Sequence, residues 1–342
     1  MPDLSPETCH DLWFQKLRPC LAYEPREDFR RWQNKARAKL GEILGANPEP
    51  VPLQVRVEWE AERGYYREIR FLFTAEKGAD VPCHLLLPKG GKAPYPVVIC
   101  LQGHTAGMHI SLGIPKSPED EKSIAGGRDF ALQAVREGYA ALAMEQRCFG
   151  ERRDQRPEQA QRLTARQACH HGTLTALLLG RTMIGERVWD VSRAIDALEQ
   201  FPQVDSSRIG CMGNSGGGTV TFYAACMDER IKVAMPSCTF CTYRHGRGAV
   251  DHCVCGYLPR VRQYFEMGDL AGLIAPRPLV IVAGAKDHLS PLIGVREAFT
   301  TAQALYKAAN AEDKIRLVVG PEGHRFYPDE AWPVFRQVSG WD

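Results

Sequence analysis

The sequence has no long hydrophobic run and no excess of charge of one sign. No segment approaches the roughly 18 consecutive apolar residues that a membrane-spanning helix needs, so we expect no membrane as partner. The 43 lysines and arginines nearly balance the 41 aspartates and glutamates, which gives no electrostatic reason to expect nucleic acid as partner. These absences favour a small substrate that is not polyanionic.

The sequence also lacks the marks of a small secreted protein. Residues 1–6 do not show the basic region and apolar run of a secretory signal. The 12 cysteines are scattered, and several lie inside apolar runs such as 97–100, which is typical of reduced thiols rather than of a disulfide framework. We therefore expect a cytoplasmic protein. Whether it forms a homo-oligomer is left open.

The spacing of apolar residues changes along the first quarter of the chain. From about Pro6 to Gly45 they recur at helical intervals. Over 53–59 the period becomes two, and similar segments follow at 69–73 and 83–87, which predicts antiparallel strands. A helical N-terminal extension is therefore expected over residues 1–50.

Beyond residue 90, short continuous apolar runs alternate with longer helical patterns. The runs are 95–101, 140–144, 209–212, 233–235, 279–283 and 315–319. Runs that are apolar on both faces fit parallel strands with helices on each side. We expect an α/β fold for residues 51–342, a three-layer sandwich around a mostly parallel, doubly wound sheet with antiparallel N-terminal strands.

Residues 213–217 match the pattern Gly-x-Ser-x-Gly, with Ser215 in the middle. The run 209–212 before it predicts a strand that follows a turn at 205–208, and 219–227 after it predicts a helix. A serine in a tight strand-to-helix turn, with glycines that allow close backbone approach, is the nucleophile elbow of an α/β-hydrolase. A glycine-rich turn or phosphate loop is the competing interpretation, but no lysine follows the glycines.

A serine nucleophile needs a general base and a carboxylate that orients it. In this fold the chain order is serine, acid, histidine. Asp287 and His324 follow the last two buried runs in that order, at the strand ends where open α/β sheets place their sites. We predict His324 as the base and Asp287 as its orienting acid. His288 is a rival base, and Asp251 and Asp269 are weaker rival acids.

The oxyanion hole should use two backbone N–H groups. One is that of Gly216, directly after the nucleophile, and the other lies in the loop 101–107 after an early strand. His104 is our candidate within that loop. Three further residues are expected to contact the substrate: Gln102, Gly103 and Asn214.

These blocks together resemble the acetyl xylan esterase-like and dienelactone hydrolase-like branch of the α/β-hydrolase superfamily. The resemblance runs through most of residues 50–335 and rests on 101–104, 180–190, 210–218, 275–278 and 323–324. It implies Ser215, Asp287 and His324 as a catalytic triad, with oxyanion amides from Gly216 and His104. The chain departs from the family at Gln102, where the usual residue is histidine.

A cysteine-rich region follows the nucleophile segment. Cys238, Cys241, His252, Cys253 and Cys255 are residue types that zinc prefers. The Cys-x-Cys spacing of the last two is unusual for zinc, however, and packing around the acyl pocket is the favoured interpretation. We therefore expect no metal and no cofactor.

The predicted function is that of a serine hydrolase that cleaves carboxylic esters through an acyl-enzyme on Ser215. Short-chain acyl or acetyl esters, including those of sugars, are the expected small-molecule substrates. Two alternatives remain: a serine peptidase or amidase of the same fold, and a non-catalytic binding protein on a hydrolase scaffold.

Overall fold

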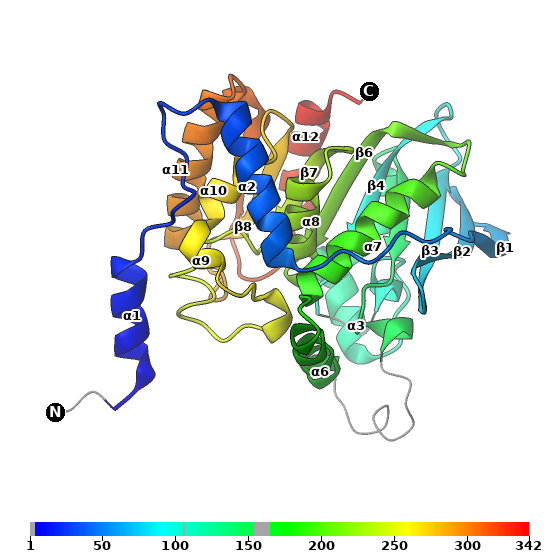
Figure 1. Cartoon of the computed structure of the whole chain (residues 1–342). Coiled ribbons are helices and arrows are strands. Elements are labelled where there is room, and N and C mark those ends of the chain that lie inside the picture. The colour runs from blue at the N-terminus through cyan, green and yellow to red at the C-terminus, as the bar shows by residue number, and fades with distance from the viewer. Residues whose placement is uncertain (1–3, 105–106, 154–164, 342) are drawn as a thin grey trace.

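The computed structural model describes residues 4–104, 107–153 and 165–341. Within them lies one nine-stranded sheet with the strand order β1-β2-β3-β5-β4-β6-β7-β8-β9 (Figure 1). The strands are β1 (Arg56–Glu62), β2 (Tyr66–Glu76), β3 (Ala79–Pro88), β4 (Tyr95–Leu101), β5 (Ala140–Met144), β6 (Val204–Asn214), β7 (Ile231–Ser237), β8 (Leu279–Gly284) and β9 (Ile315–Gly320). The pairs from β1 to β5 are antiparallel, and all pairs from β5 onward are parallel. The predicted sheet is confirmed.

Helices cover both faces of this sheet, as the continuous apolar runs predict. The helices are α1 (Pro6–Lys16), α2 (Phe29–Leu44), α3 (Pro118–Ser123), α4 (Phe130–Arg136), α6 (Ala165–Leu178), α7 (Met183–Leu198), α8 (Gly216–Met227), α9 (Val261–Tyr264), α10 (Met267–Ala271), α11 (Leu292–Ala308) and α12 (Pro328–Ser339). Shorter helical turns are η1 (Met108–Ile110), η2 (Ile124–Arg128), η3 (Gly150–Arg152), η4 (Val254–Gly256) and η5 (Glu312–Lys314). The buried side chains of α4 and α12 form one apolar cluster, and those of α2, α7, α8, α10 and α11 form another.

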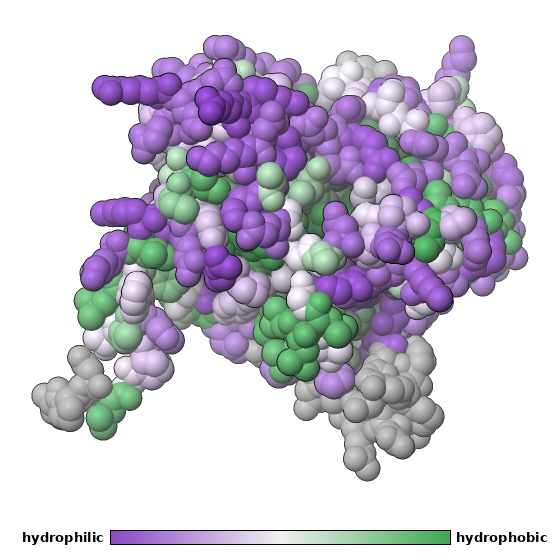
Figure 2. Space-filling view, viewed as in Figure 1, coloured by the Kyte–Doolittle hydropathy of each residue, from purple (hydrophilic) through white to green (hydrophobic). Residues whose placement is uncertain are grey.

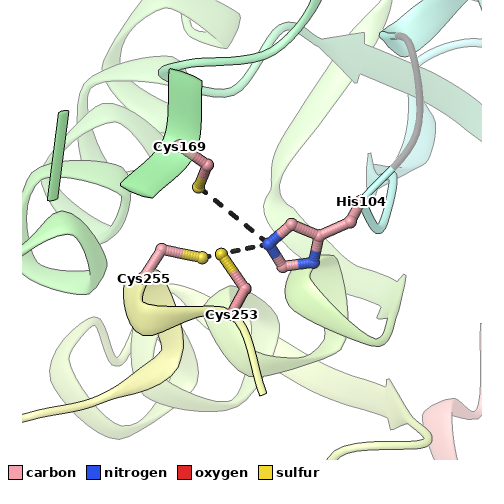
Figure 3. A group of neighbouring side chains, drawn as sticks. All are labelled: His104, Cys169, Cys253 and Cys255. Atoms are coloured by element: carbon pink, nitrogen blue, oxygen red, sulfur yellow. Dashed lines mark hydrogen bonds between the residues drawn. The ribbon is translucent and has the colours of Figure 1, made fainter. Parts of the chain in front are cut away.

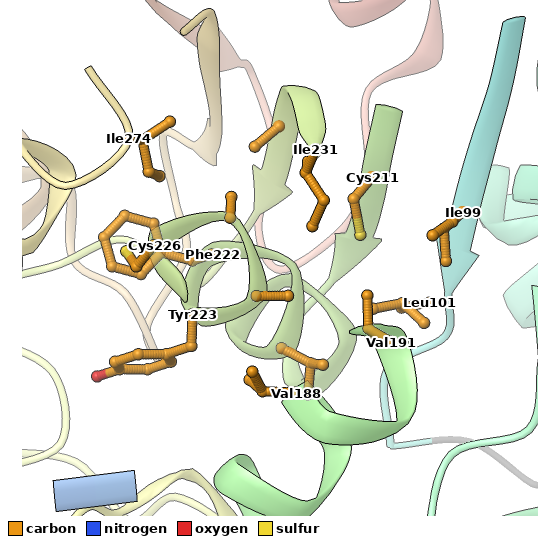
Figure 4. Close-up of a cluster of buried hydrophobic side chains, with 14 of the residues drawn as sticks. Ile99, Leu101, Val188, Val191, Cys211, Phe222, Tyr223, Cys226, Ile231 and Ile274 are labelled. Carbon is orange, nitrogen blue, oxygen red and sulfur yellow. The ribbon is translucent and has the colours of Figure 1, made fainter. Parts of the chain in front are cut away.

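Helix α8 lies in the middle of the larger cluster (Figure 4). Phe222 and Tyr223 on α8 are each only 1% exposed, and they pack in one cluster with Leu101 of β4 and Val191 of α7. Complete burial of one such apolar side chain contributes about 1.5–3 kcal/mol to folding. The start of α8, and with it the turn that carries Ser215, is therefore held against a rigid core.

The N-terminal extension divides into two helices of different character. None of the α1 residues is buried, whereas Trp32, Ala36 and Leu40 of α2 are at most 1% exposed. Gln33 Nε2 of α2 donates to two backbone carbonyls, those of Gly272 and Ala275, at 2.7 Å each. Helix α2 is thus part of the main core, and the division at residue 50 stays a prediction.

The turn expected at 205–208 is wrong, because these residues belong to β6. The register against β4 explains the error. Tyr95 pairs with Val204 and Val97 pairs with Ile209, so the extra residues of β6 bulge out of the ladder. The backbone N–H and the hydroxyl of Ser207 both donate to Asp205 Oδ1, which is a local hydrogen-bond pattern typical of a turn, although the segment lies within a strand.

The surface on the side shown in Figure 2 is mostly hydrophilic. An apolar patch interrupts it at the end of α6, where Leu174, Leu178 and Leu179 are 43%, 88% and 69% exposed. No helix in the described part of the chain combines the length and the apolar character required to cross a bilayer.

Candidate active site

Ser215 occupies the predicted turn, directly between β6 and α8. Its backbone has φ 57° and ψ −119°, a strained conformation for a residue other than glycine. The neighbouring glycines are required by space, because a Cβ on Gly213 would lie 2.6 Å from Leu101 O and one on Gly217 only 2.0 Å from the same atom. The sharp turn lifts the Ser215 side chain out of the sheet and into a cavity that it lines.

Asp287 and His324 meet at the same edge of the sheet. They follow β8 and β9, which pair in parallel up to Gly284 and Gly320, so the two loops begin side by side. His324 Nδ1 lies 2.8 Å from Asp287 Oδ2. This carboxylate therefore orients the imidazole ring with the opposite nitrogen, Nε2, directed away from it.

The surroundings of Asp287 favour its ionised form. Burial alone would raise the pKa of this carboxyl, but the hydrogen bond with His324 and the N–H groups of Leu289 and Ser290 outweigh it and hold the pKa below its usual value. If His324 acts as the predicted base, an ionised Asp287 would stabilise the positive charge that the imidazole acquires when it takes a proton.

The second ring nitrogen of His324 is available for chemistry. His324 Nε2 is buried and has no hydrogen-bond partner within the described part of the chain. His324 and Ser215 line the same cavity of about 710 Å³. A general base that is unpaired before substrate binds is compatible with catalysis, since such hydrogen bonds often tighten only in the substrate complex.

The loop after β4 packs directly against the nucleophile turn. A Cβ on Gly103 would lie 2.9 Å from Asn214 O, and one on Gly216 would lie 2.8 Å from His104 Cε1. The loop therefore lies directly beside the turn that carries Ser215, and the oxyanion roles of His104 and Gly216 remain predictions. Gly216 begins α8, so its N–H has no acceptor inside that helix. Thr105 and Ala106 of the predicted loop lie outside the described residues.

Gln102 and Asn214 lie behind the cavity wall, each 1% exposed. Gln102 Nε2 donates to Glu145 Oε1 at 2.7 Å, and Asn214 Oδ1 accepts from Ser237 Oγ at 2.8 Å. The first hydrogen bond joins the loop after β4 to the residue after β5, and the second joins the ends of β6 and β7. The substrate contacts expected of Gln102, Gly103 and Asn214 remain predictions.

Glu145, directly after β5, is a buried carboxyl group that was not among the predicted site residues. It accepts hydrogen bonds from Gln102 Nε2 and from the N–H of Met108, so it fastens both ends of the loop that carries His104. Burial raises its pKa to about 7, although the backbone N–H groups of Met108 and Glu151 oppose the shift. Its position after a strand end was the only available signal.

The rival residues have other surroundings. Asp287 is bonded to His324, while His288 is exposed on the cavity wall. Asp269 is buried in the capping box at the start of α10, where its Oδ2 accepts from the N–H of Glu266. Asp251 lines the cavity at an exposed position.

Two arginines that line the cavity were not predicted. Arg247 donates to Thr219 Oγ1 at 3.0 Å, and Arg128 Nη2 lies 3.4 Å from the backbone oxygen of His324. Burial lowers the pKa of Arg128, although the guanidinium stays charged near neutral pH. Neither arginine follows a strand, so only the folded structure identifies them.

The cysteine-rich region does not assemble as one group. His252 Nε2 lies 3.0 Å from Leu289 O, and the Sγ atoms of Cys238 and Cys241 point to the backbone oxygens of Arg325 and Pro291. Cys253 and Cys255 instead lie beside His104 and Cys169.

Comparison with known proteins agrees with this fold. The family model described as "Abhydrolase family" matches residues 5–308. The YtaP protein of Bacillus subtilis (strain 168), named as a hydrolase, is 26% identical over 291 residues, which cover 84% of this chain and 92% of YtaP. A 4-O-methyl-glucuronoyl methylesterase of Phanerochaete carnosa (strain HHB-10118-sp) is 26% identical over 239 residues, 58% of this chain and 54% of that protein.

Solved structures share the fold at lower identity. A protein from Bacteroides fragilis NCTC 9343, titled as an acetyl xylan esterase, superposes with a TM-score of 0.76 at 19% identity, covering 97% of this chain and 84% of that one. The glucuronoyl esterase from Solibacter usitatus gives a TM-score of 0.69 at 16% identity, covering 95% and 98%. With the family match over most of its length and an elbow serine at the end of β6, this chain belongs to the Abhydrolase family and has the α/β-hydrolase fold.

Proposed function

We propose that this protein is a serine carboxylesterase that acts on esters of sugars. The observation that carries the proposal is the hydrogen bond between His324 Nδ1 and Asp287 Oδ2, together with an unpaired His324 Nε2 in the cavity that Ser215 lines. A base that is oriented on one side and free on the other is what activation of a serine hydroxyl requires.

The reaction then proceeds in two steps. Ser215 Oγ attacks the acyl carbon while His324 Nε2 takes its proton, and the N–H groups of Gly216 and His104 stabilise the negative oxygen. His324 returns the proton to the leaving alcohol, which leaves an acyl group on Ser215. Water, deprotonated by His324, releases the acid and restores the serine.

The character of the cavity supports a polar substrate. Arg128, Arg247 and Thr239 line it alongside the proposed catalytic groups, so many donors are available for hydroxyl or carboxylate oxygens. Relatives named as acetyl xylan, glucuronoyl and methyl esterases point in the same direction. As all 12 cysteines are free thiols, we further propose that the enzyme works in the reducing cytoplasm.

The test combines covalent labelling with a substrate series. A fluorophosphonate probe should label the wild type and the control Ser206→Ala, whose side chain is exposed on β6, but not Ser215→Ala. Hydrolysis of p-nitrophenyl acetate and of acetylated oligosaccharides should fall about 10³-fold or more in Ser215→Ala. Unchanged ester turnover in that variant would refute the proposal, and cleavage of anilides in preference to esters would favour an amidase.

A further inference from the structure

One imidazole and three thiols converge beside the cavity that Ser215 and His324 line, and His104, Cys253 and Cys255 are among its lining residues. His104 follows β4, Cys169 is on α6, and Cys253 and Cys255 flank the start of η4. Figure 3 shows the four side chains pointing toward a common centre. Their ligand atoms, His104 Nε2 and the three Sγ atoms, all lie within 4.8 Å of one another.

The separations between the four ligand atoms are close to the edge lengths of a metal tetrahedron. Zinc lies about 2.3 Å from thiolate sulfur and about 2.0–2.1 Å from imidazole nitrogen, so tetrahedral coordination places nitrogen and sulfur roughly 3.6 Å apart. His104 Nε2 lies 3.1 Å from Cys255 Sγ and 4.0 Å from Cys169 Sγ, on either side of that value. Three thiols also exceed what one disulfide can use, and all of them are free.

The charge next to the cluster supports bound thiolates. Arg187 of α7 is 2% exposed, and its guanidinium lies 3.3 Å from Cys169 Sγ and 3.5 Å from Cys255 Sγ. Within the described part of the chain this arginine forms no ion pair with a carboxylate. A buried cation needs a compensating negative charge, and three thiolates on one divalent ion leave a net charge of −1 that Arg187 balances.

We propose that His104, Cys169, Cys253 and Cys255 bind one zinc ion. Four protein ligands close the coordination sphere, which is the arrangement of a structural site rather than of a catalytic one. The site differs from the zinc interpretation of the sequence, because Cys238, Cys241 and His252 do not take part and Cys169 and His104 replace them.

The position of the proposed ion suggests that it holds the loop that carries His104. It joins three segments that are distant in sequence, and one of them is the loop expected to supply an oxyanion donor. The His104 ring, held through Nε2, lies against the backbone of Gly216. Zinc would therefore fix the His104 backbone relative to Ser215 without touching the substrate.

Metal content tests the proposal directly and independently of esterase activity. The untagged protein, produced with added Zn²⁺, should contain about one zinc ion per chain by mass spectrometry of the metal. The content should fall at least tenfold in Cys169→Ala and Cys255→Ala. It should stay unchanged in Ser215→Ala and in Cys226→Ser, a control in which a buried thiol outside the cluster is replaced. Full zinc content in either ligand variant would overturn the proposal.

A second measurement covers the case in which the ligand variants do not fold. The wild-type protein is stripped with a chelator and given Co²⁺ alone, which should produce the visible absorption of tetrahedral cobalt bound to thiolates. Titration with Zn²⁺ should abolish that absorption at about one equivalent. Absence of the cobalt spectrum, or a disulfide between any two of the three cysteines in freshly purified protein, would refute the site.

Discussion

Two of the histidines that line the cavity, His104 and His324, have different partners. His324 is bonded to a carboxylate at 2.8 Å, whereas the nearest polar partner of the His104 ring is the sulfur of Cys255 at 3.1 Å. The first pairing leaves a nitrogen free to move protons. The second occupies the nitrogen that points into the cluster, so this ring cannot serve as a base once a metal is bound.

The carboxyl groups behind the two histidines also differ. Asp287 holds His324 directly and has a pKa below its usual value, whereas Glu145 holds the His104 loop through Gln102 and Met108 and has a pKa raised to about 7. Partners decide the outcome in the first case and burial decides it in the second. We refer to Ser215, Asp287 and His324 as the carboxylate wall, and to His104, Cys169, Cys253 and Cys255 as the thiol wall. In the proposed function the first would transfer protons and the second would position the loop after β4.

The largest expected effect on activity comes from removal of the Asp287 carboxylate. Asp287→Asn should lower kcat about 10⁴-fold, because an amide cannot hold the productive tautomer of His324 or stabilise the imidazolium. Steady-state hydrolysis of p-nitrophenyl acetate measures the loss. Zinc content should not change, and a parallel loss of metal would mean that the two walls are not independent.

A smaller effect is expected from Glu145→Gln, measured as stability against pH. Since the folded state raises the pKa of Glu145 from 4.5 to about 7, the neutral form is favoured, and its contribution to stability is lost as pH rises through that range. The wild type should therefore lose on the order of 3 kcal/mol relative to the variant between pH 4.5 and 8. Urea unfolding of both proteins at several pH values gives the difference, and parallel curves would contradict the assignment.

Removal of the proposed zinc ion should lower activity less than the Asp287 change. We expect kcat to fall about 10–100-fold with a small change in KM, because the oxyanion donor is displaced while the triad stays intact. Activity is measured before chelation, after chelation, and after return of Zn²⁺ alone. Recovery with zinc but not with Mg²⁺ is expected, since thiolate sites do not retain magnesium.

Gly216→Ala tests whether the position of the His104 ring affects catalysis. Its new Cβ would lie 2.8 Å from His104 Cε1, so the ring must move, and we expect about a tenfold loss of kcat/KM. The matched control is Gly64→Ala, where no atom lies within 4 Å of the added Cβ. Equal activity of both variants would show that the ring contact is unimportant.

The smallest effect is expected at Cys238, the cysteine on the carboxylate side. Burial raises the pKa of this thiol to about 12, so it stays protonated and donates to Arg325 O. Cys238→Ser keeps a donor of similar size, and activity should stay within about threefold of the wild type. Zinc content should also be unchanged, in contrast to Cys255→Ala.

The residues of the carboxylate wall could be predicted from the sequence because each lies next to a recognisable strand. Ser215, Asp287 and His324 each follow a continuous apolar run that forms a strand of the sheet, and strand ends of a parallel sheet meet at one edge. The grouping of the thiol-wall residues could not be predicted in this way. Its members lie at 104, 169 and 253–255. The packing of α6 against η4 brings the cysteines together, and His104 reaches them from the loop after β4.

Prediction of the secondary structure from the sequence has the same limit. Apolar runs identified the strands β4 to β9, but Pro328–Ser339 was not predicted as α12, since Pro333 interrupts its helical pattern. The polar sequence of 205–208 is typical of a turn, yet in the structure these residues form a bulge within β6. Both errors concern segments whose conformation depends on neighbouring strands and helices.

The contact network around Arg187 has a consequence for engineering of this enzyme. Its guanidinium reaches α6 through Cys169, η4 through Cys255, and the chain after β5 through Arg147 O at 2.7 Å. Segments that shape the cavity are thus fastened to one side chain and cannot be exchanged like independent loops. Libraries that aim at new specificity should randomise these segments together or leave Arg187 and its partners intact.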